Sequence, residues 1–498
     1  MLLGRVGRAA LGTLASRLSG FVRDAAIAYA FGASASYDAF LVGLFIPQAL
    51  RQVIGEAGLA TAFVPVYAQA RARGQDVALL RAFTRVLLLA LVPIVGLGCV
   101  LARLYVPVLA AGFPPEKMRE AISLAAWLFP LIAFVSLSAL QAAVLNVHGA
   151  FFLPALAPAL LNLGMALGAL FLSALFRPPI FGLVAGTLLG GLFSVLFLWP
   201  SFRRHYRGPA RANPVPAPEI RRDLGVVGWR LLPALGGLLV AEANTLVDNR
   251  LASYLPHGSI ATLQYAMRLF QFPLGVLAVS VATVALPALA DHVAHGDAER
   301  FRRTLERGFL LTAALMVPAT LGLGLLAEPA VAVLFERGAF GRADTLRTAQ
   351  NLQGYVVGLW AYALVYLFSR AFFALGRPTL PLLGGALALG VNIGLNLWWV
   401  RLWGTFGLAL ATGVAGWVDA LFLGALLWRK APGWLVPKDL VRSFLAAGLM
   451  AAAVWGLREG LAPYGSWAQV LVAMPAGFFL YLGLARGLGL WTRLRAEG

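Results

Sequence analysis

Charged side chains inside apolar stretches are the residues of this chain that could do chemistry. Two such stretches lie between residues 16 and 65, and their charged residues are Arg17, Arg23, Asp24, Arg51 and Glu56. An ionisable group is costly in hydrocarbon, so these side chains normally face a protein-lined or watery cavity and mark a transport path. The alternative is that Arg17 and Arg23 lie at a membrane interface and extend to the lipid headgroups.

A third apolar stretch adds another arginine. Arg268 stands just before the residues FPLG at positions 272–275, and Pro and Gly can bend or break a helix and free backbone groups near a substrate. Arg23, Arg51 and Arg268 therefore offer guanidinium groups from three different stretches. A guanidinium stays protonated at physiological pH and forms forked hydrogen bonds to phosphate oxygens, so a cluster of them suits an anion such as a pyrophosphate.

Asp24 is expected to hold the neighbouring arginine side chains in place and to offset part of their charge when the site is empty. The alternative is a set of arginine–carboxylate or arginine–carbonyl pairs that only fix helix packing. The two interpretations share the same residues and differ in whether the guanidinium groups meet in one cavity.

A second polar group combines one carboxylate with three neutral oxygen-bearing side chains, Asp248, Asn392, Asn396 and Thr412. Asn392 and Asn396 are four residues apart on one helical face, and Thr412 comes from the following stretch. These oxygens could coordinate Na⁺, or Asp248 could carry a proton. Hydrogen bonds that only pack the helices are the alternative.

Residues typical of catalysis or of metal binding do not form a pattern. Cys99 is the only cysteine, and the five histidines lie in or beside predicted loops without a partner at ligand spacing. We therefore expect neither an enzyme nor a metal site, and no cofactor beyond a coupling monovalent cation, Na⁺ or H⁺.

The elements that position these residues are membrane helices. Of the 498 residues, 60% are hydrophobic and only 12% are charged, whereas soluble proteins have roughly 25% charged residues. Apolar windows of about 20 residues recur along the whole chain and predict about 14 spans, all of them helices. The spans are expected to begin near residues 8, 38, 83, 122, 154, 180, 226, 262, 306, 346, 379, 403, 439 and 466. The chain is thus expected to be an all-α polytopic membrane protein.

The net charge of +19 comes from arginines in short loops, a pattern that orients membrane helices and places both termini in the cytoplasm. A nucleic-acid partner is not expected. The Pro- and Arg-rich stretch 203–225 reads as a cytoplasmic linker. It separates an amino-terminal lobe of six helices, 1–202, from a carboxy-terminal lobe of six helices, 226–430, and residues 431–498 add two helices and a tail.

The two halves repeat each other at a shift of about 225 positions. The repeated pairs are ATAFVP (60–65) and ATVALP (282–287), LNLG (161–164) and VNIG (391–394), and FGLVAGTLLGG (181–191) and FGLALATGVAG (406–416). Three matches in the same order indicate duplication of a six-helix unit.

The motifs SRLSGFVRD (16–24), DAF (38–40), LRQVIGEAGLATAFVP (50–65), YAMRLFQFPLGVL (265–277) and LFERGAF (334–340) together resemble the MurJ (MviN) family of lipid II flippases. This family is part of the multidrug/oligosaccharidyl-lipid/polysaccharide exporter superfamily. The resemblance implies two six-helix lobes around a central cavity plus two further helices. It also implies that the protein moves an undecaprenyl-pyrophosphate-linked disaccharide pentapeptide from the inner to the outer leaflet for peptidoglycan synthesis.

By the same resemblance, the substrate-binding cavity residues are Arg17, Arg23, Asp24, Arg51 and Arg268, with Asp38 in a family motif. The chain departs from the family at three positions. Gln52 stands where many members have a second arginine, and Ala57 follows Glu56 in place of the usual glycine. Asn396 replaces a carboxylate that a cation site in this family can use, which puts ion coupling in question.

The expected mechanism is alternating access. The expected partners are lipid II, the bilayer of a bacterial cytoplasmic membrane and, as a further option, cell-wall synthesis enzymes. Two alternatives within transport are a flippase for another lipid-linked oligosaccharide and a multidrug exporter of the same superfamily. An alternative outside transport is a membrane scaffold for cell-wall synthesis.

Overall fold

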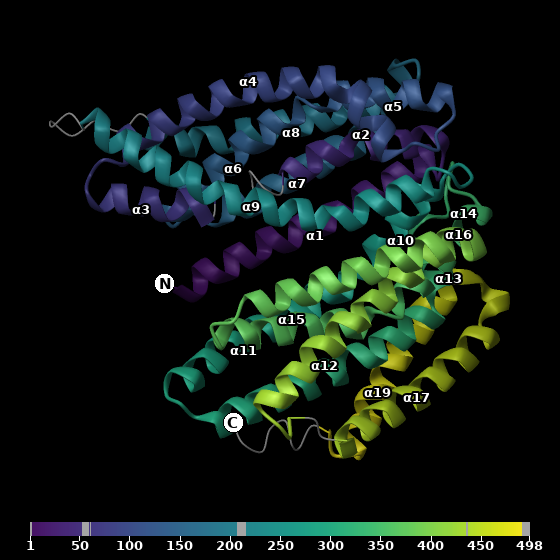
Figure 1. Cartoon of the computed structure of the whole chain (residues 1–498). Coiled ribbons are helices and arrows are strands. Elements are labelled where there is room, and N and C mark those ends of the chain that lie inside the picture. Colours follow the sequence, from purple (N-terminus) through teal and green to yellow (C-terminus); the bar gives the residue numbers. More distant parts are fainter. Residues whose placement is uncertain (1, 52–58, 60, 207–215, 435–436, 491–498) are drawn as a thin grey trace. The chain divides into compact units, whose positions relative to one another are not determined.

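The computed structural model describes residues 2–51, 59, 61–206, 216–434 and 437–490, and helices account for nearly all of them (Figure 1). No strand occurs in these ranges, which confirms the all-α class. The helices of the first part of the chain are α1 (Leu2–Phe31), α2 (Ala35–Arg51), α3 (Val64–Ala72), α4 (Asp76–Leu109), α5 (Pro115–Leu128), α6 (Leu131–Val147), α7 (Phe152–Leu170), α8 (Ile180–Tyr206) and α9 (Ala217–Ala252).

The helices of the second part are α10 (Ser259–Pro273), α11 (Val279–Ala294), α12 (Ala298–Leu325), α13 (Ala327–Phe335), α14 (Arg342–Val356), α15 (Leu359–Ala374), α16 (Thr379–Lys430), α17 (Pro437–Gly460), α18 (Gly465–Ala468) and α19 (Met474–Gly487). Every predicted span begins inside one of these helices. Among the described residues, nine helices are long and apolar enough to cross a membrane, or ten if α14 and α15 form one bent span. The total of about 14 spans stays a prediction.

Helix α16 contains two limbs joined at Gly404. This glycine has φ 57° and ψ −131°, outside the helical region, and a positive φ is readily adopted only by glycine. The chain therefore reverses there, and the limbs 379–403 and 405–430 correspond to the two separate spans that the sequence predicts.

The chain forms two compact units. The first contains residues 1–258 and Arg337–Phe340, and the second contains Ser259–Glu336 and residues 341–498. This division falls after α9 rather than at the predicted linker 203–225. Helix α9 belongs to the first unit because Val227, 1% exposed, packs in a core with Leu80 and Phe83 of α4.

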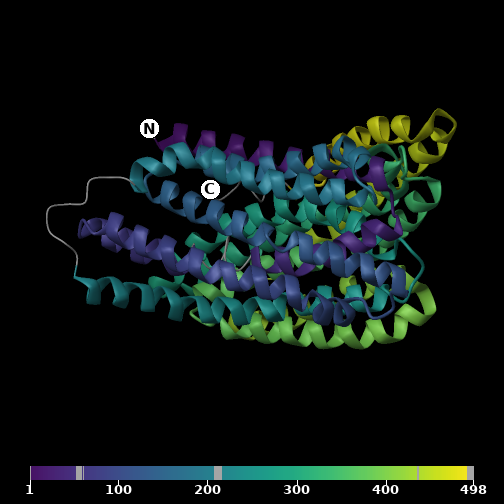
Figure 2. The ribbon, with the colours of Figure 1, turned by 90° about the horizontal axis from the view of Figure 1, so that it is seen from above.

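Within each unit the long helices run side by side (Figure 2). Close packing of α7 on α8 depends on glycines of the two repeated motifs. An ideal Cβ on Gly186 would overlap the backbone of Gly164 and Gly168 on the facing helix. Small residues let helix backbones approach closely where lipid supplies no hydrophobic driving force.

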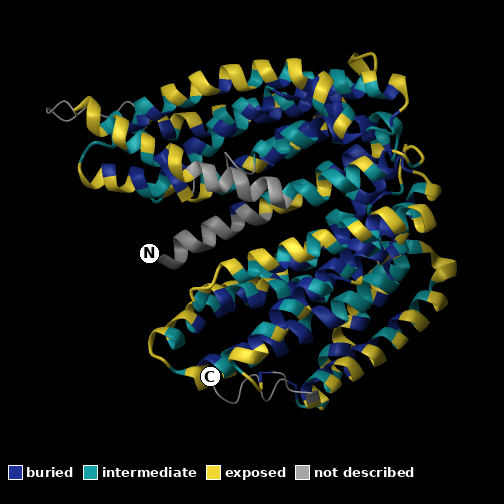
Figure 3. Cartoon of the chain, in the orientation of Figure 1, coloured by how far each residue is buried: buried dark blue, intermediate teal, exposed yellow. Residues whose placement is uncertain are grey.

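Helix α4 is exposed along much of its length (Figure 3), and many of its exposed residues are large and apolar. Leu89, Val92 and Val100 of α4 are each more than 70% exposed. In a chain with this many apolar spans, such a face contacts lipid rather than water.

Candidate functional site

Arg23 lies on α1 and is held by two neighbours within the first unit. Its Nε donates to Oδ1 of Asp24 at 2.8 Å, and its Nη2 lies 2.7 Å from the same oxygen. Its Nη1 donates to Oδ1 of Asn162 on α7 at 2.8 Å. The Arg23 side chain is 15% exposed, so the guanidinium is fixed between two helices and is not extended toward an interface.

Asn162 is in turn oriented by α1. Its Nδ2 donates to Oγ of Ser19 at 3.0 Å and to the carbonyl oxygen of Ser16 at 3.3 Å, which fixes its Oδ1 toward Arg23. A guanidinium has five N–H donors, and three of those on Arg23 are engaged in this network. Its Nη1 and Nη2 each keep a second N–H for a ligand, because the residues that the structure describes accept no further bond from them.

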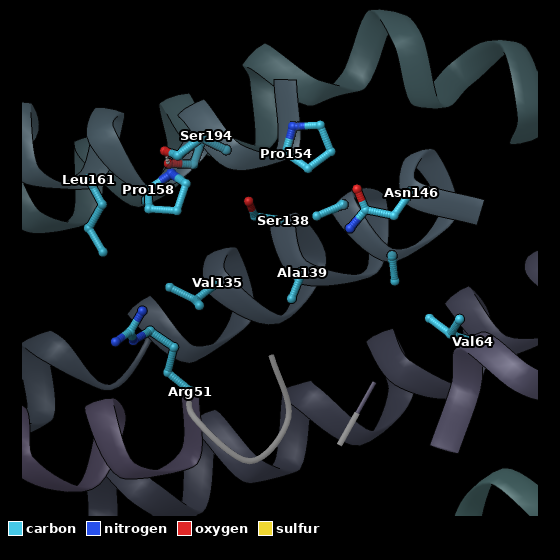
Figure 4. A pocket seen from close by; sticks show the side chains of 14 residues that line it. Arg51, Val64, Val135, Ser138, Ala139, Asn146, Pro154, Pro158, Leu161 and Ser194 are labelled. Carbon is cyan, nitrogen blue, oxygen red and sulfur yellow. Dashed lines mark hydrogen bonds between the residues drawn. The ribbon is translucent and has the colours of Figure 1, made fainter. Parts of the chain in front are cut away.

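Arg51 ends α2 and faces a cavity of about 370 Å³ inside the first unit. Figure 4 shows its guanidinium pointing into this space. The rest of the lining is mostly apolar, with hydroxyl groups from Ser138 and Ser194 and an amide from Asn146. Among the described lining residues, Arg51 is the only permanent cation, and a guanidinium forms forked hydrogen bonds to anionic oxygens. The neighbouring Gln52, Glu56 and Ala57 lie outside the described residues.

Arg17 and Arg268 lie on different units. Arg17 is an exposed residue of α1, six positions before Arg23. Arg268 is half-buried on α10, and α10 continues into α11 through a π-helical turn at Leu274–Ala278. The turn confirms that the helix is irregular where Pro273 and Gly275 predicted it. Such π-turns are frequent at functional sites.

Asp38 lies in a polar network that the sequence did not indicate. Its Oδ2 accepts a 2.8 Å bond from Nζ of Lys117 on α5 and a 2.7 Å bond from the backbone N of Gly258. The carboxylate is 1% exposed. Asp38 therefore joins α2, α5 and the residue before α10, and its predicted contact with substrate stays a prediction.

The structure brings together three of the four residues of the predicted cation group. Nδ2 of Asn396 donates to Oδ1 of Asn392 at 2.6 Å, and Nδ2 of Asn392 donates to Oγ1 of Thr412 at 3.3 Å. All three are buried between the limbs of α16. Asp248 is four residues from the end of α9, in the first unit. Arg250, in the last turn of α9, donates to the carbonyl oxygen of Val108 at 2.7 Å.

The two repeats thus use the same helix pair with different polar chemistry. Asn162 in LNLG and Asn392 in VNIG both sit beside a helix that begins with FGL. Asn162 accepts a hydrogen bond from the guanidinium of Arg23 on α1, whereas Asn392 forms hydrogen bonds with Asn396 and Thr412. The sequence marks Asn162 as a polar residue within a repeated apolar motif. It does not show that Arg23 is the partner of Asn162.

Arg23, Asp24 and Arg51 therefore belong to the first unit and Arg268 to the second. The pairing of Asp24 with Arg23 is the arrangement that the sequence predicts. The convergence of the three arginines on one cavity stays a prediction, as does the contribution of Arg17.

The sequence profile of the lipid II flippase MurJ family matches residues 27–474. A probable lipid II flippase MurJ of Vibrio cholerae is 32% identical over 496 residues, which is 96% of this chain and 93% of that protein. The lipid II flippase MurJ of Burkholderia cenocepacia is 32% identical over 440 residues, covering 85% and 84% of the two chains.

Solved structures agree. A lipid II flippase MurJ in an inward closed conformation is 27% identical, with a TM-score of 0.79 over 97% of this chain and 98% of that one. A multidrug resistance transporter of the MATE family, in the MOP superfamily, is 16% identical to this chain. Its TM-score is 0.69 over 84% of this chain and 97% of that one, which shows a shared fold. This chain is a multi-pass membrane protein and belongs to the lipid II flippase MurJ family.

Proposed function

We propose that this protein moves lipid II, an undecaprenyl-pyrophosphate-linked disaccharide pentapeptide, from the inner to the outer leaflet of a bacterial cytoplasmic membrane. Family membership over most of the chain supports the substrate. The observation that carries the chemistry is Arg23, a guanidinium fixed by Asp24 and Asn162 that keeps two N–H donors for an anion. An Arg with this geometry suits a phosphate better than a cationic drug.

In this proposal the headgroup enters from the cytoplasmic side by alternating access. Arg23, Arg51 and Arg268 hold the pyrophosphate, while the polyprenyl tail stays in lipid along α17 and α19. Movement of one unit against the other then exposes the headgroup on the outer side. The protein supplies a polar passage, and no bond of the substrate is made or broken.

We further propose that Asp248, Asn392, Asn396 and Thr412 bind a coupling monovalent cation, Na⁺ or H⁺. At the repeat shift of about 225 positions, Asp248 corresponds to Arg23 and Asn392 lies near the counterpart of Asn162. A carboxylate in place of the guanidinium favours a cation where the first repeat favours an anion. Loss of Na⁺-dependent thermal stabilisation in Asp248→Asn would support this role, and unchanged stabilisation would contradict it.

The orientation follows from the arginine-rich loops, which put both termini in the cytoplasm. Contacts with cell-wall synthesis enzymes are compatible with this placement.

A leaflet-accessibility assay in cells depleted of the native protein tests the proposal. Plasmid-borne wild type should restore lipid II to the outer leaflet, whereas Arg23→Ala, Arg51→Ala and Arg268→Ala should not, at equal membrane abundance. Arg300→Ala is the matched control, because its side chain is 74% exposed and pairs only with Asp297 among the described residues. Full activity of all three cavity variants would overturn the proposed roles.

The same cells separate the alternatives. A scaffold for cell-wall synthesis would still support growth when the cavity arginines are neutralised, which a flippase forbids. A multidrug exporter would bind an organic cation in preference to a pyrophosphate lipid, although an arginine-lined cavity repels cations. A flippase for another lipid-linked oligosaccharide would move that lipid faster than lipid II.

A further inference from the structure

Asp419 is a buried carboxylate that the proposed transport mechanism does not use. It lies on the second limb of α16 and is 8% exposed. Its side chain packs against Gly384 on the first limb, where an ideal Cβ would overlap the Asp419 carboxylate. Glycine at 384 therefore makes room for an acid inside the helix pair.

The carboxylate has no charge partner in this position. Its Oδ1 is buried and accepts no hydrogen bond from the residues that the structure describes. Asp419 is 14 residues beyond the tip of the hairpin at residue 405, or about 21 Å along the helix, which is well inside a membrane-spanning segment. An ionised carboxylate without a partner is costly at this depth, so the carboxyl is expected to carry a proton.

Among the described residues, the charged and titratable groups of the surrounding helices form no hydrogen bond or ion pair with the Asp419 carboxyl, and Tyr366 of α15 is an exposed residue. The first limb of α16 has no titratable residue between Thr379 and Val400. On α15, Tyr362 contacts Gly416 and donates to the carbonyl oxygen of Thr412. Arg370 of the same helix lies beside the ring of Phe373. It follows Phe368, the residue of α15 that contacts Gly424.

Helix α14 meets α16 near Leu410 through Gly354. Its charged residue Arg347 donates instead to Ser259 of α10, and its other titratable side chains are Arg342, Asp344 and Tyr355. On the limb that carries Asp419, the next charges are Arg429 and Lys430 at the helix end.

We propose that Asp419 is a proton-binding site of the second unit, separate from the Asn392–Asn396–Thr412 group. A proton fits better than Na⁺, because Na⁺ needs several converging oxygen ligands. The neighbours of Asp419 on the facing limb are the Cα of Gly384 and apolar side chains. Asn392 and Thr412 lie two turns nearer the hairpin tip and bond to each other.

The chemical step is a simple exchange. When the second unit rearranges and water reaches Asp419, the O–H bond breaks and the proton passes to water, which leaves the carboxylate. In the reverse step hydronium donates a proton to the carboxylate, the O–H bond forms again, and water leaves. If the proposed function is right, this exchange gives the flippase a means of responding to a transmembrane proton gradient, so this part of the inference rests on that function.

Infrared difference spectroscopy on the purified full-length protein tests the site without any substrate. A pH step should reveal the carbonyl stretch of a protonated carboxyl in the wild type, and Asp419→Asn should remove it. Asp291→Asn, at an exposed carboxylate, is the matched control and should keep the band. An unchanged band in Asp419→Asn would overturn the proposal. Should that variant be unstable, Asp419→Ser repeats the measurement.

A second measurement tests coupling separately. In proteoliposomes, the ratio of flipping rates with and without an imposed pH gradient should differ from one for the wild type and fall to one for Asp419→Asn. If the ratio of flipping rates in Asp419→Asn stays at the wild-type value, the coupling role is overturned, even if the infrared band is lost. Loss of Na⁺-dependent thermal stabilisation in Asp419→Asn would assign the site to Na⁺ and overturn the proton assignment. A wild type that flips no lipid would contradict the proposed function alone.

Discussion

Asn162 of α7 accepts a 2.8 Å hydrogen bond from Arg23 of α1, while its own amide donates back to Ser19 and Ser16 of α1. The amide of Asn162 therefore holds the guanidinium of Arg23 in a fixed position relative to the preceding turn of α1, which carries Ser16 and Ser19. An arginine that is oriented before its ligand arrives loses less side-chain entropy on binding.

We expect Asn162→Ala to weaken binding of a pyrophosphate lipid without abolishing insertion. A hydrogen bond to a charged group contributes about 2 kcal/mol, which corresponds to roughly thirtyfold in affinity. Titration of purified protein with the lipid measures the loss. The double variant Arg23→Ala/Asn162→Ala should bind no more weakly than Arg23→Ala, since Asn162 acts through Arg23. Additive losses would show that Asn162 has a separate role.

The buried pair of Asp38 and Lys117 leads to a stability prediction. Lys117→Met removes the ammonium group 2.8 Å from the buried Asp38 carboxylate, and loss of one partner of a buried ion pair costs about 3–5 kcal/mol. Thermal unfolding in detergent should show this loss. The double variant Asp38→Asn/Lys117→Met should recover more than half of it, because no charge then remains unpaired. Equal instability of the two variants would contradict the ion-pair account.

The contact between α7 and α8 predicts a selective effect of one methyl group. Gly186→Ala places a Cβ against the backbone of Gly164 and Gly168, so the helices must separate, at a cost of roughly 1–3 kcal/mol by analogy with overpacked cores. Gly385→Ala is the matched control, because nothing lies within 4 Å of its ideal Cβ. Similar melting temperatures for both variants would argue against this contact.

His148 gives the folded protein a pH dependence. Burial, the stacked ring of His205 and the charge of Arg71 lower the pKa of His148 from 6.5 to about 4. The unfolded chain therefore binds a proton that the folded chain does not, and stability falls as the pH drops from about 6.5 toward 4. His148→Gln, which can keep a bond to Tyr67, should flatten this part of a melting-temperature profile. An unchanged slope would show that other titratable groups cause this pH dependence.

Local patterns predicted much of the fold and less of the site. Apolar windows located the nine helices that are long and apolar enough to span among the described residues. Glycines of the first-half motifs, Gly164 and Gly186, lie in a close helix contact. The Gly404 reversal matched the predicted break between two spans. These features depend on residues that are near each other in sequence.

Contacts between distant residues could not be predicted in the same way. Lys117 belongs to none of the motifs that the sequence singled out, and only the fold brings it to Asp38. Asn162 was noticed as part of a repeat, but its bond to Arg23 depends on the packing of α7 on α1. The place of α9 in the first unit depends on Val227 meeting α4, which no local pattern signals.

Reconstitution of purified protein with lipid II in vesicles tests the central claim most directly. The fraction of lipid II that becomes accessible on the opposite leaflet should rise with time for the wild type and for Arg300→Ala. It should stay at the protein-free level for Arg23→Ala. Wild-type rates in Arg23→Ala would contradict the claim that this guanidinium holds the headgroup during transport.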